Sequence, residues 1–329
     1  MEIGKIPNDI LQELILDKIE YRRNEFLIRP KVGEDCSAVD FRNNLCVIST
    51  DPITGTAKEI GRLAVHISCN DVASCGAEPI GIMITILAPP GATEAELAQI
   101  MAQVSEAAGE LNVDVMGGHT EVTNAVSRFV ISGVALGKVP AGKLVRTSGA
   151  LPGDQVVLTK TAGIEGTAII AYDREDELAS SFGGEFVEKA KAFMNSISVV
   201  KEGIIAGEYG VSSMHDVTEG GILGAAWEVS EASGVGIRLY KEKIPVAFET
   251  AKICEVYKIN PLRLISSGCM LITCQNGEDL VKKLEANHIR ASVIGVMTRS
   301  PEKRIIGEDC EELITPPESD EMHKVLNSS

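Results

Sequence analysis

Carboxylate side chains stand beside small or turn-forming residues in four short segments of the first 121 residues. The segments are Gly33–Ala38 (GEDCSA), Ser49–Pro52 (STDP), Cys69–Ala73 (CNDVA) and Gly117–Glu121 (GGHTE). If they converge, two carboxylates about 4 Å apart repel by about 4 kcal/mol at an effective dielectric of about 20. A fold tolerates this when a cation neutralises the cluster. Carboxylate oxygens suit Mg²⁺, which shares its coordination shell with phosphates. The pattern therefore predicts a metal–nucleotide site.

The acidic residues Asp35, Asp51 and Asp71 are the candidate metal ligands of this site. Each also has a plainer interpretation. Asp35 suits an Asx turn, Asp51 suits a turn before Pro52, and Asp71 suits the surface of a helix. The helical face around Asp71 is apolar, however, and a buried carboxylate is costly unless it is paired or bound to metal. Taken as a series, the three residues favour ligands.

Gly117 and Gly118 follow an apolar run and can bring backbone N–H groups close to an anion, because glycine permits close approach and positive φ. His119, Thr120 and Glu121 would then face the same phosphate region. The alternatives are a structural histidine within a turn and a solvated carboxylate.

The later segment Met214–Gly221 (MHDVTEGG) precedes an apolar pattern of helical spacing. It is typical of a loop that feeds a helix N-terminus, which is a ready anion site. The candidate binding residues there are His215, Asp216, Thr218 and Gly220. Thr218 can equally cap the helix, and both interpretations are compatible. A weaker phosphate candidate is Lys160–Thr167, which lacks the spacing of a P-loop.

The length of 329 residues favours two domains. The chain has 31 basic and 47 acidic residues, a formal charge of −16 that argues against a nucleic-acid partner. The longest apolar run is too short to span a bilayer, and the N-terminus lacks a signal core, so we expect a cytoplasmic protein without membrane attachment. The eight cysteines are scattered without a CxxC pair, which favours reduced thiols.

The periodicity predicts alternating strands and helices, hence an α/β or α+β fold. In the first half, strands are expected at 45–49, 82–87, 113–116 and 129–136, and helices at 8–17, 58–75 and from Thr93, where a capping box stands. In the second half, strands are expected at 155–159, 235–240, 268–274 and 291–297, and helices at 184–195, 197–209, 219–232 and 277–287.

Turn-rich sequence between Gly137 and Pro152 places the domain boundary there, giving domains 1–145 and 146–329. The last fifteen residues, from Thr315, are polar and carry two prolines, so we expect them to be partly loose.

The motifs GEDxxxVD, STDPIT, NDVAxxGAxP, GGHTEVT and HDVTEGG occur in this order between Gly33 and Gly221. Together they resemble the AIR synthase-related (PurM-like) superfamily, and within it the hydrogenase-maturation (HypE-like) type. The match runs to about Gly295. Single motifs are weak, but five in series are specific.

The resemblance implies a PurM-like two-domain architecture, with a C-terminal α/β sandwich and an N-terminal sheet that pairs into a dimeric barrel. It implies ATP and Mg²⁺ as cofactors and a homodimer. It assigns metal or phosphate contacts to Asp35, Asp51 and Asp71, and a catalytic or metal role to Glu121 with His119 beside it. Nucleotide contacts fall on Gly117, Gly118, Thr120, Asn70 and Thr50, and in the second domain on His215, Asp216, Thr218 and Gly220.

Members of this superfamily activate a carbonyl or amide oxygen as a phosphate ester. In the maturation type the substrate is a thiocarboxamide on the protein's own C-terminal cysteine. The last cysteine here is Cys310, so we do not expect chemistry on the chain's own tail. Thiamine-monophosphate kinase, a relative, carries Asp where His119 stands, and selenophosphate synthetase needs an earlier cysteine than Cys36.

Three functions remain open from the sequence. The first is ATP-dependent activation of an amide or carbonyl on a small or protein-bound substrate. The second is a nucleotide-binding maturation or scaffold protein without turnover, which works with maturation partner proteins. The third is a small-molecule kinase of the thiamine-monophosphate kinase type.

Overall fold

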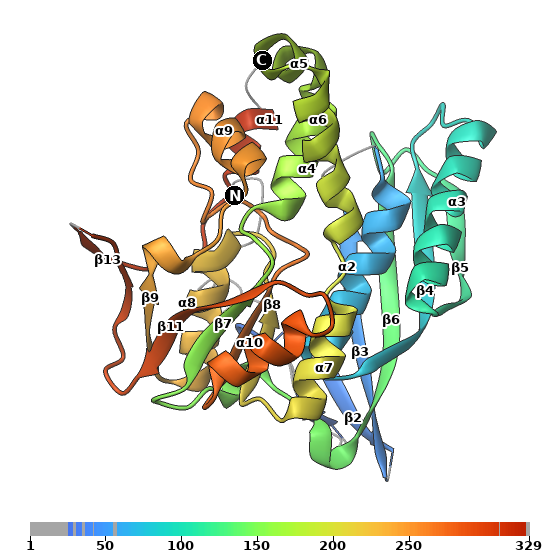
Figure 1. Ribbon diagram of the computed structural model, residues 1–329. Helices are drawn as coiled ribbons and strands as arrows, with labels where there is room; N and C mark the ends of the chain where they lie inside the picture. Colours follow the sequence, from blue (N-terminus) through green and yellow to red (C-terminus); the bar gives the residue numbers. More distant parts are fainter. Residues whose placement is uncertain are drawn as a thin grey trace.

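Two β-sheets, one from each half of the chain, organise the structure (Figure 1). The computed structural model describes residues 26–28, 31–34, 37–41, 43–54, 58–308 and 310–326. The first sheet has the strand order β1-β2-β3-β6-β4-β5, and the second has the order β13-β12-β9-β11-β7-β10-β8. The predicted helix at 8–17 and the candidate ligand Asp35 lie outside the described residues.

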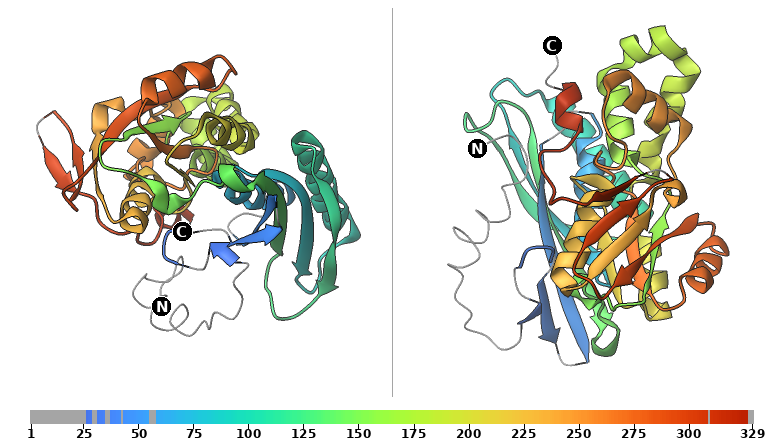
Figure 2. Two further views of the ribbon diagram at one scale, coloured as in Figure 1. Left: turned by 90° about the horizontal axis from the view of Figure 1, so that it is seen from below. Right: turned by 90° about the vertical axis from the view of Figure 1, so that its left-hand side faces the viewer.

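Among the described residues, the helices that cover the N-terminal sheet lie on one of its faces, as the views in Figure 2 show. Its strands are β1 (Phe26–Ile28), β2 (Ser37–Phe41), β3 (Asn44–Ile53), β4 (Glu78–Ala88), β5 (Asp114–Val122) and β6 (Val130–Pro140), and its helices are α2 (Ile60–Ser74) and α3 (Glu94–Leu111). Every residue of α2 is buried, because the helix lies between this sheet and the C-terminal half. The predicted capping box of α3 is confirmed: Thr93 accepts from the Glu96 N–H, and Glu96 accepts from the Thr93 N–H.

The C-terminal sheet is covered on both faces. Its strands are β7 (Gln155–Thr159), β8 (Ser213–Asp216), β9 (Gly236–Tyr240), β10 (Met270–Cys274), β11 (Ala291–Thr298), β12 (Lys303–Ile306) and β13 (Glu311–Leu313). Its α-helices are α4 (Ile164–Asp173), α5 (Glu175–Phe182), α6 (Gly184–Lys191), α7 (Val200–Tyr209), α8 (Gly221–Ser233), α9 (Phe248–Tyr257), α10 (Gly277–Glu285) and α11 (Met322–Leu326). Strand β10 is buried along its whole length, as expected for a strand between two layers. On one face, Met214 of β8 and Ile272 of β10 lie in the same buried cluster as Leu280 of α10.

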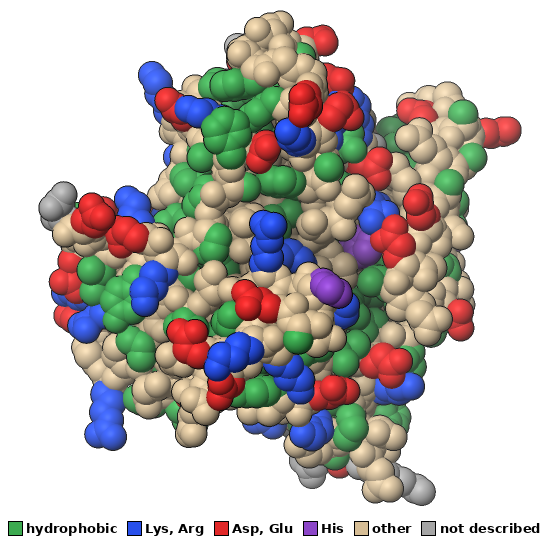
Figure 3. All heavy atoms as spheres, in the orientation of Figure 1, with side chains coloured by type: hydrophobic (Ala, Val, Ile, Leu, Met, Phe, Trp, Pro, Cys, Tyr) green, Lys and Arg blue, Asp and Glu red, His purple; other side chains and the backbone are tan. Residues whose placement is uncertain are grey.

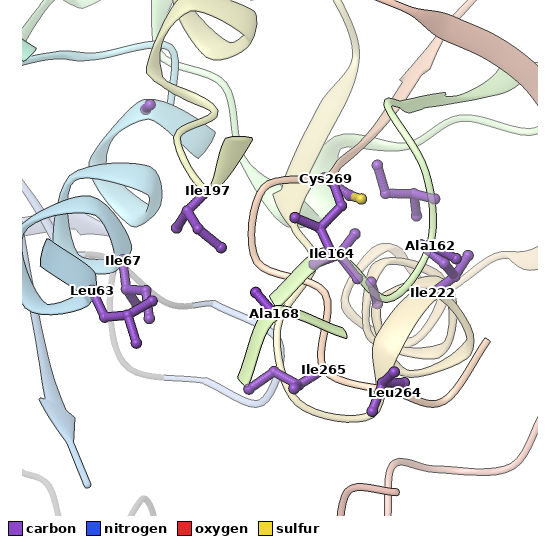
Figure 4. Packing of buried hydrophobic residues seen from close by; sticks show 14 of the residues in the cluster. Leu63, Ile67, Ala162, Ile164, Ala168, Ile197, Ile222, Leu264, Ile265 and Cys269 are labelled. Atoms are coloured by element: carbon purple, nitrogen blue, oxygen red, sulfur yellow. The ribbon is translucent and has the colours of Figure 1, made fainter. Parts of the chain in front are cut away.

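The two halves meet where α2 packs against α7 and the loop before it (Figure 1). In Figure 4, Leu63 and Ile67 of α2 lie in the same buried cluster as Ile197. Glycines let the two backbones approach closely. A Cβ atom added to Gly203 would lie 2.2 Å from the Ala73 carbonyl oxygen. No larger residue fits at Gly203 without displacing one helix, so the sequence itself specifies this close contact.

Most predicted elements are confirmed, and the differences have identifiable causes. Strand β5 continues through Gly117–Glu121, beyond Met116 where we expected it to end, because parallel pairing with β4 extends to Val122. The glycine-rich segment after Lys160 begins helix α4, with Gly163 as its N-cap, and Gly166 packs against Leu264. It is therefore packed against the protein interior and is not an open phosphate loop. No helix in the described ranges is long and apolar enough to cross a membrane.

Candidate active site

Two of the predicted metal ligands, Asp51 and Asp71, lie on elements that pack together, because α2 contacts β3. Ser49 and Asp51 lie on the same face of β3, because alternate residues of a strand share a face. The hydroxyl of Ser49 donates to Asp71 Oδ2 over 2.5 Å, and Asp71 is only 3% exposed. Asp51 and Asp71 therefore lie on the same side of β3, and their role as metal ligands stays a prediction.

Thr50 lies on the opposite face of β3 from Ser49 and Asp51. It is exposed, and its hydroxyl is 3.4 Å from that of Ser132 on β6. Within one chain, the Thr50 side chain therefore lies on the other side of the sheet from Asp51 and Asp71. The prediction that Thr50 contacts the same nucleotide as these carboxylates is corrected for a single chain.

A second group of buried polar side chains lies at the end of β8, which is in contact with α2. Asp216 is 1% exposed and His215 is 2% exposed. The Nε2 atom of His215 lies 3.0 Å from Glu228 Oε2 on α8. His215 is therefore held by a carboxylate of its own domain, a contact that the sequence did not predict.

The residues just before Asp35 pack against this second group. A Cβ atom added to Gly33 would lie 3.1 Å from the Glu228 carbonyl oxygen, and Glu34 accepts a hydrogen bond from the Ser148 N–H. The first two residues of the GED motif, Gly33 and Glu34, therefore contact the C-terminal half of the chain, beside the helix that carries Glu228. Asp35 itself is outside the described ranges.

Asn70 joins the two halves of the chain. Its amide nitrogen donates to the Ile197 carbonyl over 2.9 Å, and its amide oxygen accepts from the Val199 N–H over 2.8 Å. Asn70 is completely buried. These two bonds show a structural role for Asn70, whereas we predicted a nucleotide contact.

Replacing Asn70 with Ala is expected to lower the free energy of unfolding by about 2 to 4 kcal/mol, because two buried backbone groups lose their partners. Chemical denaturation followed by circular dichroism measures this. Asn124→Ala, at an exposed position, is the control and should change stability by less than about 0.5 kcal/mol. Equal stability of N70A and wild type would contradict a structural role for Asn70.

The segment Gly117–Glu121 lies at the far edge of the N-terminal sheet from Asp51. Asp51 pairs with Gly133, Gly133 with Ile84, and Ile84 with Gly118, so the four residues form one row across the sheet. Neighbouring strands are about 4.8 Å apart, so this row spans about 14 Å. The prediction that all the acidic segments converge is therefore wrong for this segment within one chain.

The side chains of this edge strand are exposed to solvent. His119 and Glu121 are 65% and 50% exposed, and His119 Nε2 lies 3.2 Å from Glu121 Oε2. Thr120 is exposed as well. Gly117 and Gly118 have φ values of 143° and 154°, and a Cβ atom on Gly118 would meet the Ile84 carbonyl. Close strand packing, rather than an anion, explains why Gly118 is a glycine.

The loop from Val217 to Gly220 leads from β8 into α8, as predicted for an anion site. The Gly220 N–H, however, donates to Asp320 Oδ2 over 2.9 Å. Thr218 makes no side-chain cap of α8. A carboxylate of the protein itself thus takes the place that we predicted for a ligand at Gly220.

Sequence reasoning gave little weight to a half-buried lysine near the junction. Lys160 Nζ lies 2.5 Å from Glu202 Oε1 and donates to the carbonyls of Ser198 and Gly268. Lys160 also has a φ of 55°, in the left-handed region. Its position at the end of β7 was the only signal in the sequence.

His66 on α2 is a further buried titratable residue that the sequence analysis missed. Burial, followed by the charge of Arg62, lowers the pKa of His66 to about 4, so the ring is neutral near pH 7. Arg62 forms a two-bond ion pair with Glu110 of α3. Lys, Arg and His side chains are visible along the groove between the two halves in Figure 3.

The donor set fits a magnesium ion that shares its shell with phosphate oxygens. The described ranges contain no group of three or more Asp, Glu, His or Cys side chains placed to hold a metal alone. Mg²⁺ commonly takes one or two carboxylates and completes its octahedron with water and substrate phosphates. Asp51 and Asp71 supply carboxylates of that kind.

Comparison with known proteins identifies two family domains. The N-terminal domain of AIR synthase related protein matches residues 33–139, and the C-terminal domain matches residues 152–308. A hydrogenase expression/formation protein of Methanocaldococcus jannaschii is 27% identical over 92% of this chain and 91% of its own length. A carbamoyl dehydratase HypE of Bradyrhizobium diazoefficiens is 32% identical over 74% of this chain and 70% of its own length.

Solved structures share the same fold. The HypE–HypF complex superposes with a TM-score of 0.73 at 23% identity, over 94% of this chain and 99% of the other. A HypE in complex with ATP superposes with a TM-score of 0.69 at 19% identity, over 98% and 97%. The predicted PurM-like two-domain architecture is confirmed by these matches.

Proposed function

Because the chain belongs to the AIR synthase-related family, we propose that it is an ATP-dependent enzyme that dehydrates a carbamoyl-type amide. The main support is the site beneath α2, where Asp51 and Asp71 lie on one side of the sheet. Relatives named carbamoyl dehydratase, and a solved HypE with ATP, support the same reaction class.

The reaction converts R–C(=O)NH₂ and ATP into R–C≡N, ADP and phosphate. The amide oxygen leaves as part of the phosphate, and the nitrogen loses two protons. ATP, when bound, supplies the phosphoryl group that makes this oxygen a leaving group. In this chain, Asp51 and Asp71 would hold Mg²⁺ against the phosphates, with Asp35 as a third candidate. Neutralisation of phosphate charge is the main requirement of phosphoryl transfer.

Apart from Thr50, Asn70 and Gly220, the remaining predicted residues keep their roles as proposals. His215 and Asp216 lie on β8, which contacts α2, and we propose that they reach the site from the C-terminal half. His119 and Glu121, together with Gly117, Gly118 and Thr120, are 14 Å away by the strand spacing of about 4.8 Å. They can reach the same nucleotide only if a second copy of the chain brings them there.

Phosphate release from MgATP in the presence of a panel of amides and thiocarboxamides tests this function. Release that depends on one class of amide is the expected result. MgATP binding without any release would favour a scaffold protein, and transfer of phosphate to an alcohol would favour a kinase. If calorimetry shows no binding of MgATP, the dehydratase, scaffold and kinase functions are all refuted.

A homodimer is part of the proposal. No helix of the described part of the chain covers the outer face of the N-terminal sheet, where Ile80, Met83 and Val134 are 37%, 47% and 37% exposed. Val134 pairs with Met83 on one side and with Thr50 on the other, so these side chains form one apolar surface. A second copy of the sheet would cover this surface and its edges.

Val134→Asp is expected to convert the dimer into a monomer, because a charge in a buried sheet interface is not solvated. Sedimentation velocity measures the change. Val256→Asp is the control: Val256 is similarly exposed, at 41%, but lies on α9 in the other half. A wild-type protein that sediments only as a monomer would refute the proposed dimer.

A maturation protein is the proposed partner class, because HypE is found in complex with HypF. The proposed location is the cytoplasm, since the seven described cysteines are free and five of them are buried. Burial raises the pKa of Cys69 and Cys254 to about 12, so these thiols are unreactive.

A further inference from the structure

The C-terminal segment, which we expected to be partly loose, is anchored to the protein through Pro317 and residues 320–326, while Thr315, Pro316, Glu318 and Ser319 are exposed. Helix α11 lies against α4, and Arg174 donates to the Val325 carbonyl over 2.7 Å. Met322 and Val325 are 3% and 1% exposed. Pro317 contacts Gly220, where a Cβ atom would lie 2.9 Å from the proline ring. We call residues 315–326 the C-terminal strap.

A single carboxylate connects this strap to two loops of the C-terminal half. Asp320 Oδ2 accepts from the Gly220 N–H over 2.9 Å, and Oδ1 accepts from the Ile265 N–H over 3.1 Å. Oδ1 also accepts from the Met322 N–H within the strap. Asp320 is 1% exposed, so water cannot substitute for these bonds. Three donors on one buried carboxylate are typical of a fixed structural link.

The loop that Asp320 holds is the one that carries the predicted binding residues. Gly220 follows Thr218 and caps α8, and Asp216 ends β8 four residues earlier. Gly221 has a φ of 60°, and a Cβ atom on it would lie 2.7 Å from the carbonyls of Leu262 and Leu264. The position of the Val217–Gly220 loop therefore depends on the neighbouring 262–265 loop, and Asp320 joins both.

We propose that Asp320 is a positioning residue, through which the C-terminal strap fixes the Val217–Gly220 loop in the geometry that nucleotide binding requires. This inference rests on the proposed function for its ligand. Its structural half, the fixing of the two loops, is independent of any ligand.

Burial and neighbouring carboxylates disfavour the charged form of Asp320, whereas its backbone hydrogen bonds favour it. Burial raises the pKa of Asp320 to about 6, although its three backbone hydrogen bonds act in the opposite direction. The charge of Glu219 adds to the increase, and Glu165 on α4 faces the same carboxylate. A carboxylate placed so close to two others is retained where its hydrogen bonds matter, which agrees with a positioning role.

Asp320→Asn tests the inference, because it keeps the shape of the side chain and replaces one acceptor with a donor. Hydrogen–deuterium exchange of peptides covering 217–221 and 262–266 is expected to accelerate at least about tenfold, with the sheet unchanged. The Kd for MgATP, measured by calorimetry, is expected to rise at least about tenfold. Asp320→Glu keeps the charge, so its increases in exchange rate and in Kd should be smaller than those of Asp320→Asn. It serves as the milder variant if Asp320→Asn does not fold.

Glu318→Gln is the matched control, since Glu318 is an exposed acid two residues away in the same strap. It should leave both measurements unchanged. Faster exchange in D320N with an unchanged Kd for MgATP would mean that the link is merely structural, and would overturn the inference. Unchanged hydrogen–deuterium exchange in D320N would overturn it as well. A wild-type protein that binds no MgATP would instead refute the proposed function, and the exchange rates would still decide whether Asp320 fixes the loops.

Discussion

Replacing Asp71 with Asn is expected to reduce MgATP-dependent phosphate release on the order of 100- to 1,000-fold, the scale of losing one group that stabilises transition-state charge. Asn keeps an oxygen that can accept from Ser49, so the local hydrogen bond survives. The negative charge that would hold Mg²⁺ is lost. Steady-state phosphate release, with Mg²⁺ varied, measures the effect, and the apparent Kd for Mg²⁺ should rise with it.

Asp114→Asn is the control for this substitution, because Asp114 is an exposed carboxylate at the start of β5. Its phosphate release should match that of the wild type. If D71N retains wild-type release at every Mg²⁺ concentration, Asp71 is not a metal ligand, and the site beneath α2 loses its main support.

Replacing Glu165 with Gln is expected to stabilise the protein above pH 7. Burial raises the pKa of Glu165 to about 7, and the nearby charges of Asp320 and Glu219 add to the increase. Its Oε2 atom has no hydrogen-bond partner among the described residues. A carboxyl whose pKa in the folded protein lies above its ordinary value of 4.5 contributes its full stability below about pH 4.5 and loses that contribution as the pH rises from there through about 7.

The expected gain of E165Q over wild type is about 3 kcal/mol at pH 8.5 and vanishes below about pH 4.5. Chemical denaturation at a series of pH values measures it. Glu94→Gln is the control, since Glu94 also lies in the first turn of a helix but is exposed. A stability difference between E165Q and wild type that does not depend on pH would contradict the raised pKa of Glu165.

Local sequence patterns predict those helices and strands whose deciding interactions lie between residues close together in the sequence. The capping box of α3 needs only Thr93 and Glu96, and both of its bonds are present. Strand β7 was predicted at Gln155–Thr159 and has those bounds, because turns flank an apolar run. In both cases the deciding interactions lie within a few residues along the chain.

Contacts between distant parts of the chain decide the elements that the sequence did not predict. The strand before Gly117 and Gly118 was expected to end at Met116, yet pairing with β4 holds both glycines in an edge strand. Asp320 read as part of a loose tail, yet its partners are 100 and 55 residues away at Gly220 and Ile265. In the candidate site, the shared face of Ser49 and Asp51 follows from the alternation along β3, whereas the pairing of His215 with Glu228 was not predictable.

The glycine contacts of α7 with α2 and with the turn after it limit how the two halves of the chain can move. Ala73 faces Gly203, Gly76 faces Gly207, and Asn70 is bonded to the loop before α7, so backbone meets backbone with no side chain between. A hinge at this junction would have to break all of these contacts at once. In the proposed reaction, substrate entry and product exit would then depend on local loop motion, and the two lobes should tumble as one rigid particle with and without nucleotide.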